Sequence, residues 1–141
     1  MNTRSIVCTN ANKLVKQGYS RSEAFKKAWA LAKVSDITVK VKGTSFGSRQ
    51  TALEHLTRYD TADVSYVIAA DVHNSHDSNA VAVVAKVRDK GAFVIGYLPA
   101  GLAANISPLL RAGLVCRPTG WVTGKYQPYM NYGATVRLMF A

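Results

Sequence analysis

The sequence contains little cysteine and no long hydrophobic run, and each shortage excludes a class of protein. Cys8 and Cys116 are the only cysteines among 141 residues, so a disulfide-stabilised scaffold is excluded and a reducing cytoplasm is the expected location. Two distant cysteines also provide no tetrahedral ligand set for zinc. The longest apolar runs, such as residues 81–85, are much shorter than the roughly 20 residues that span a bilayer. No secretory signal is expected either, because the N-terminus lacks an apolar segment followed by a cleavage site.

Acidic residues are also scarce. Eight Asp and Glu stand against eighteen Lys and Arg, for a net charge of +10 and a pI near 9.9. Such a field concentrates polyanions, so nucleic acid is the first partner to consider. An anionic membrane surface needs an amphipathic basic helix or a lipid anchor as well. Charge alone does not separate a nucleic-acid-binding protein from a basic protein that is merely soluble.

What is abundant is apolar: 48% of the residues are hydrophobic and the mean hydropathy is near zero, so the chain can bury a core. Its charge is distributed unevenly over two parts, residues 1–35 and residues 36–141. The first part holds seven basic residues and one acidic residue, for a net +6, and the second holds eleven and seven, for a net +4. The basic residues of the first part are Arg4, Lys13, Lys16, Arg21, Lys26, Lys27 and Lys33.

Residues 1–35 are predicted to form a helical hairpin. Apolar residues recur at near-helical spacing up to Gly18, which is placed to end the first helix. Ser20 and Glu23 then form a capping-box pattern at the start of a second helix that is rich in alanine. Two interpretations of its basic face remain: a contact with DNA or a partner protein, or a packed appendage with a solvated face, which we favour.

From residue 36 the hydrophobic period changes from about 3.6 to 2. The alternation over 37–42 predicts a strand, and further strands are expected over 64–72, 80–87, 92–98, 114–123 and 132–140. A short helix capped by Ser48 is expected to end at Leu56, and Pro99 suits the start of a helix that reaches about Arg111. The predicted fold is α+β, mainly β: a small OB-like or SH3-like antiparallel barrel of about six strands with inserted helices.

Three phrases in order then resemble one family. They are VKGTSF at residues 41–46, HNSHDSNAVAV at residues 73–83 and IGYLP at residues 95–99. Together they are similar to the HIRAN domain over roughly residues 37–140. The resemblance implies a six-stranded OB-like barrel that grips the 3′ end of single-stranded DNA in a small pocket.

The resemblance also assigns roles to individual residues. It implies that Asn74 belongs to the pocket, that Asp77 recognises the terminal 3′-hydroxyl and that Phe46 stacks on a base. His76 stands where the family has a Tyr, and Tyr97 stands where it often has a His. The resemblance further implies that Tyr132 lies near the rim of the pocket and that Asn79 braces the loop. Ser45 stands where the family has an Arg that helps to hold phosphate.

The chemistry of single-strand binding suits these residue types. Flat rings accept stacked bases and cations follow the backbone, and the candidate cations are Lys40, Lys42, Arg49 and Lys125. A carboxylate at Asp77 can accept a hydrogen bond from a terminal hydroxyl and repel a phosphate in the same place. The alternative for Asp77 is a hydrogen bond to its own backbone in an Asx-turn, and aromatic rings at strand ends often fill the core instead.

Catalysis, metal binding and cofactors have little support. The histidines and acidic residues are scattered, His73 and His76 lack the partners of a metal site, and no phosphate-binding glycine loop is present. We therefore expect a cytoplasmic, non-enzymatic protein that binds single-stranded or frayed DNA ends, as an adaptor in DNA repair, replication or mobile-element biology. The alternative is a phage or mobile-element module that binds and inhibits a host nuclease, defence or repair factor.

Overall fold

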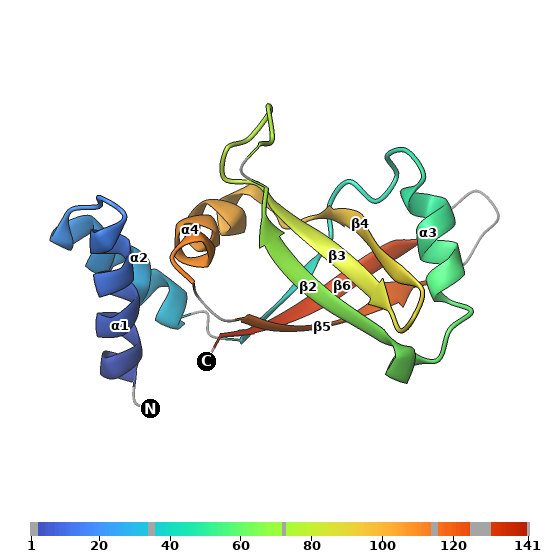
Figure 1. Ribbon diagram of the computed structural model, residues 1–141, viewed down its shortest axis with the longest axis horizontal. Helices are drawn as coiled ribbons and strands as arrows, with labels where there is room; N and C mark the ends of the chain where they lie inside the picture. The colour runs from blue at the N-terminus through green and yellow to red at the C-terminus, as the bar shows by residue number, and fades with distance from the viewer. Residues whose placement is uncertain (1–2, 34–35, 72, 114–115, 125–130, 141) are drawn as a thin grey trace.

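The computed structural model describes residues 3–33, 36–71, 73–113, 116–124 and 131–140 (Figure 1). Its elements begin with the helices α1 (Thr3–Lys16) and α2 (Arg21–Lys33). The expected cap is present, because the backbone N–H of Glu23 donates to the Ser20 hydroxyl at 3.2 Å. Apolar residues of both helices, including Leu14 and Leu31, are buried where the pair meets α4 (Ala100–Arg111). The predicted helical hairpin is confirmed.

Six strands form two three-stranded antiparallel sheets. One sheet has the order β1 (Asp36–Lys40), β6 (Gly133–Phe140), β5 (Cys116–Thr123). The other has the order β2 (Val64–Ala70), β3 (Val81–Val87), β4 (Gly91–Tyr97). Their facing sides supply the core: Val81, Val83 and Ile95 come from one sheet, and Val136 and Leu138 from the other.

The expectation of a closed barrel was wrong, because the described residues form two separate sheets. A single bridge joins them: the backbone N–H of Lys42 donates to the Tyr97 carbonyl at 2.8 Å, and the N–H of Tyr97 donates to the Lys42 carbonyl at 2.9 Å. On the opposite side, the ring of Tyr66 on β2 packs close to Gly120 on β5. Among the described residues, β2 and β5 form no ladder of hydrogen bonds, so the sheets face each other as a sandwich there.

Two further expectations need adjustment. The first strand ends at Lys40 rather than Lys42, because Lys42 leaves the sheet of β1 to pair with Tyr97. Ser48 does precede α3 (Arg49–Leu56), but its side chain makes no capping hydrogen bond. The helix after Pro99 begins and ends as expected. A short 3-10 helix, η1 (Thr61–Asp63), leads into β2.

Gly96 explains how closely the two sheets approach at the bridge. A Cβ atom at this position would lie 2.4 Å from the Lys42 carbonyl oxygen and 2.4 Å from Cγ1 of Val41. Real Cβ atoms essentially never come so close to another atom, so only glycine permits the chain to cross beside β4.

None of the helices described in the structure is long and apolar enough to cross a membrane.

Candidate nucleic-acid interface

A groove of about 490 Å³ lies beside the bridge between the sheets. It is bordered by the chain after β1, the start of α3, the loop between β2 and β3, and the end of β4. Its lining residues are Lys42, Gly43, Phe46, Arg49, Asn74, His76 and Tyr97. None of them is acidic, so the groove combines two permanent cations with three aromatic rings.

Arg49 lies between two of these rings. Its guanidinium carbon is 6.0 Å from the centre of the Phe46 ring and 5.3 Å from the centre of the Tyr97 ring. Nη1 also donates to the Gly43 carbonyl at 2.7 Å. Gly43 has a φ of +73°, and a Cβ there would be 3.1 Å from Nη1. The loop therefore needs glycine both for its conformation and for the approach of Arg49.

Phe46 is an exposed aromatic ring of the groove. Its exposed fraction is 69%, although an apolar ring of this size is usually buried. The first turn of α3 holds the segment in place, because the N–H of Arg49 donates to the Phe46 carbonyl at 3.2 Å. One face of the ring meets Arg49 while most of its surface meets solvent, so it can accept a stacked group.

The loop between β2 and β3 is braced by its own side chains. Oδ1 of Asn74 accepts from the N–H groups of His76 at 2.9 Å and Asp77 at 3.0 Å. Oδ1 of Asp77 accepts from the N–H of Asn79 at 2.9 Å. The guanidinium of Arg111 donates to the Ser78 carbonyl from α4. The Asx-turns that the sequence permitted are therefore present, and they direct Asn74 and the exposed His76 to the groove.

Tyr97 is anchored by an acidic residue that sequence reasoning did not place in the site. Its hydroxyl donates to Oδ2 of Asp71 at 3.0 Å, and Nδ2 of Asn74 donates to the same oxygen at 3.4 Å. Burial raises the pKa of the Tyr97 hydroxyl, and Asp71 raises that pKa further, while the Arg49 charge acts in the opposite direction. The signal available in the sequence was an acidic residue at the end of a strand that is otherwise apolar.

Comparison with known families agrees with this geometry. The HIRAN domain family matches residues 28–140, which is most of the chain. The chain belongs to the HIRAN domain family. HIRAN domains are non-catalytic modules that bind DNA ends. No curated protein and no solved structure matches the chain.

The HIRAN match begins at Ala28, within α2, and so includes part of the basic helical pair. The change of hydrophobic period predicts a domain boundary at residue 36. That division into a hairpin and a β-domain stays a prediction.

Not every predicted site residue of this HIRAN domain reaches the groove. Asp77 is half-buried in its turn and does not line the groove, and exposed Lys40 lies at the end of β1 outside it. Tyr132 packs partly against the core. Its backbone N–H donates to Oε1 of Gln50 at 2.8 Å, and its carbonyl accepts from Nε2 of Gln50 at 2.7 Å. Lys125 lies outside the described residues.

Gln50 is a second residue that sequence reasoning missed. Besides its two bonds to Tyr132, its Nε2 donates to the Thr44 carbonyl at 2.9 Å. It thereby joins α3 to the loop before it and to the start of β6. No local pattern in the sequence indicates such a role for a polar residue on a short helix.

In the part of the chain that the structure describes, no group of three His, Cys, Asp or Glu side chains is placed to hold a metal ion.

Proposed function

We propose that this HIRAN domain binds the 3′ end of single-stranded DNA in the groove and catalyses no reaction. The observation that carries the proposal is the exposed Phe46 ring, held beside Arg49 and Tyr97 in a groove that no acidic side chain lines. A stacking platform next to a cation is the arrangement that single-strand binding uses.

Arg49 is suited to the phosphate nearest the end. Its guanidinium has five N–H donors, and one of its nitrogens bonds Gly43, so the remaining donors are available to a phosphate. Lys42 borders the same groove with an exposed side chain. The family places a phosphate-binding Arg at the position of Ser45, and in this chain Arg49 supplies a guanidinium nearby.

Asp77 is proposed to accept the terminal hydroxyl. Its Oδ1 holds the Asn79 N–H, but a carboxylate has about four lone-pair sites, so the turn leaves capacity for a further donor. The same negative charge disfavours a terminal phosphate. Asp77 does not itself line the groove, but Asn74 and His76, which come just before it in the loop, do.

The decisive experiment is a competition between matched oligonucleotides that end in a 3′-hydroxyl or a 3′-phosphate. We expect the wild-type protein to prefer the hydroxyl end. Asp77→Asn is the sharpest variant, because its amide oxygen can still accept from Asn79 while the charge is lost. We expect this variant to have a smaller difference in affinity between the 3′-hydroxyl and the 3′-phosphate end, while the loop stays folded. Equal affinity of the wild type for both ends refutes the end pocket.

Phe46→Ala tests the stacking platform. Loss of one stacked base weakens single-strand binding by about 1–3 kcal/mol, and this loss should be the same for both kinds of end. Trp121→Ala is the matched control, because Trp121 is an exposed ring on the other sheet, 47% exposed. Equal losses of affinity from both variants contradict the assignment of Phe46 as the stacking platform.

Salt dependence tests whether the protein binds DNA directly. The logarithm of the affinity should then fall linearly with the logarithm of the salt concentration. Absence of DNA binding at low salt favours a protein partner instead.

A further inference from the structure

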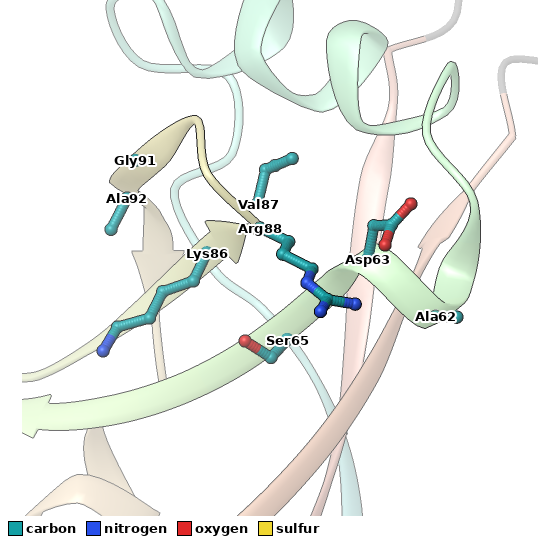
Figure 2. Close-up of a pocket in the computed structure, with 8 residues that line it drawn as sticks. All are labelled: Ala62, Asp63, Ser65, Lys86, Val87, Arg88, Gly91 and Ala92. Atoms are coloured by element: carbon teal, nitrogen blue, oxygen red, sulfur yellow. The ribbon is translucent and has the colours of Figure 1, made fainter.

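A second basic hollow lies at the far end of the sheet that carries Tyr97. It has a volume of about 540 Å³ and is formed at the β3–β4 hairpin beside the start of β2. Figure 2 shows the side chains of Ser65, Lys86 and Arg88 around it, with the Lys86 ammonium on the side away from Asp63. The ion pairs of the described residues, Arg58–Glu54 and Arg137–Asp36, involve none of these side chains.

The strand register places this hollow on the same face of the sheet as the groove. Tyr97 pairs with Ala82, and Ala92 pairs with Lys86. Ala82 and Lys86 are four residues apart on β3, so their side chains point to the same face. A bulge between the two pairings takes up one extra residue, the fully buried Ile95. Without it, Tyr97 and Ala92 would point to opposite faces of β4.

The face between the two sites is apolar. It is the outer face of β2, β3 and β4, opposite the core, and in Figure 1 no helix lies across it. The outward positions between the sites carry small apolar side chains: Val67, Ala69, Val84 and Val94. No residue of these three strands is acidic. A polyanion crossing these strands therefore meets no acidic side chain of theirs, and Asp63 is the acidic residue that lines the hollow itself.

We infer that a single DNA strand whose end lies in the groove continues over this outer face and is held again by Lys86 and Arg88. The inference rests on the proposed function for the position of the end. Charge complementarity supports it, because the hollow has two exposed cations against one acidic lining residue, Asp63. Neither cation forms an ion pair among the described residues. The surface is continuous with the groove. The apolar face between them can lie against bases while the phosphates remain in solvent.

The separation of the two sites sets the length of strand that can reach both. Tyr97 and Ala92 pair with Ala82 and Lys86, which are four residues apart on β3, and this corresponds to about 13 Å at the usual rise of a strand. A dinucleotide covers only about 7 Å even when it is stretched to about twice the B-form spacing of about 3.4 Å per nucleotide, whereas a dodecanucleotide covers about 37 Å at the B-form spacing. Only the longer strand can occupy the groove and contact Lys86 and Arg88 together.

The test compares these two lengths, each with a 3′-hydroxyl, on the full chain carrying Lys86→Ala and Arg88→Ala together. We expect affinity for the dodecanucleotide to fall about tenfold or more, since two charge-assisted phosphate contacts are lost. The slope of log affinity against log salt should fall by about 1.4. Affinity for the dinucleotide should stay as in the wild type. Lys16→Ala with Lys26→Ala is the control, because both residues are exposed on the N-terminal helices and the same charge is removed.

The outcomes separate this inference from the proposed function. Unchanged dodecanucleotide affinity overturns the second contact, and so does an equal loss for both lengths or an equal loss in the control variant. A length-dependent loss without any preference for a 3′-hydroxyl supports the second contact and refutes the end pocket. Binding of an acidic protein that depends on Lys86 and Arg88, with no effect on DNA, overturns the inference in favour of another occupant.

Discussion

The hydroxyl of Tyr97 donates a hydrogen bond to Oδ2 of Asp71 at 3.0 Å, which ties the end of β4 to the chain just after β2. The backbone of the same tyrosine pairs with Lys42. Tyr97 therefore connects the end of β4 to the segments that follow β1 and β2, beside the groove. Arg49 packs over its ring, so the position of the cation depends on this tyrosine as well.

The first prediction concerns the ionisation of Tyr97. Its pKa is raised by burial and by Asp71, so Asp71→Asn should lower the pKa of Tyr97 toward its ordinary value. Because the pKa of Tyr97 is higher in the folded than in the unfolded protein, its ionisation affects the free energy of unfolding. The contribution of Tyr97 to that free energy is fully present below the ordinary tyrosine pKa, and it is lost as the pH rises through the pKa of the folded state. NMR titration of labelled tyrosine, assigned with Tyr97→Phe, measures the change.

The control for this titration is Asp89→Asn. Asp89 is exposed in the β3–β4 turn and has a φ of 62°, a conformation that asparagine tolerates well. The substitution removes the same charge far from Tyr97. If Asp71→Asn shifts the pKa of Tyr97 no more than Asp89→Asn does, the contact with Asp71 is not a cause of the raised pKa.

The second prediction concerns the bridge between the sheets. Gly96→Ala places a Cβ atom against the Lys42 carbonyl and Val41, and overpacking of this kind costs about 1–3 kcal/mol. Gly101→Ala is the matched control, because Gly101 lies in α4 with no atom within 4 Å of the added Cβ. Alanine is favoured there by about 0.5–1 kcal/mol. Urea unfolding should therefore show shifts of opposite sign, and two shifts of the same sign contradict the prediction.

The third prediction concerns the two cysteines. Cys8 is exposed, whereas Cys116 is half-buried and its pKa is raised to about 11, chiefly by burial. The thiolate is the reactive form, so Ellman's reagent at pH 8 should modify Cys8 quickly and Cys116 slowly. Cys8→Ser leaves only the slow phase, which urea should accelerate. A fast phase in that variant without urea is inconsistent with the burial of Cys116.

The fourth prediction concerns Gln50. Gln50→Ala removes its bonds to Thr44 and to both backbone groups of Tyr132. Partly buried groups that lose their partners cost about 1–3 kcal/mol, so the midpoint of urea unfolding should fall. Gln17→Ala at the end of α1 is the control, because Gln17 is exposed. A fall no larger than that of the control shows that Gln50 does not hold the segments together.

The sequence alone was sufficient for the elements and for the family. Period-2 alternation located the strands, and the Ser20–Glu23 pattern placed the start of α2, because both signals are local and arise from neighbouring residues. The three ordered phrases indicated the HIRAN domain, and the family match over residues 28–140 confirms it. The resemblance also named Phe46, Asn74, His76 and Tyr97, and the chemistry of single-strand binding added Lys42 and Arg49 as cations; all of them line the groove.

Only the tertiary structure decided how these elements meet. Barrel closure depends on whether two strand edges come within hydrogen-bonding distance, and the described strands instead pair in two separate sheets. The partnership of Tyr97 with Asp71 joins residues 26 positions apart, and the one-residue bulge at Ile95 keeps the groove and the Lys86–Arg88 hollow on one face. No local pattern encodes these relationships, because each arises from the register and approach of segments that are distant in the chain.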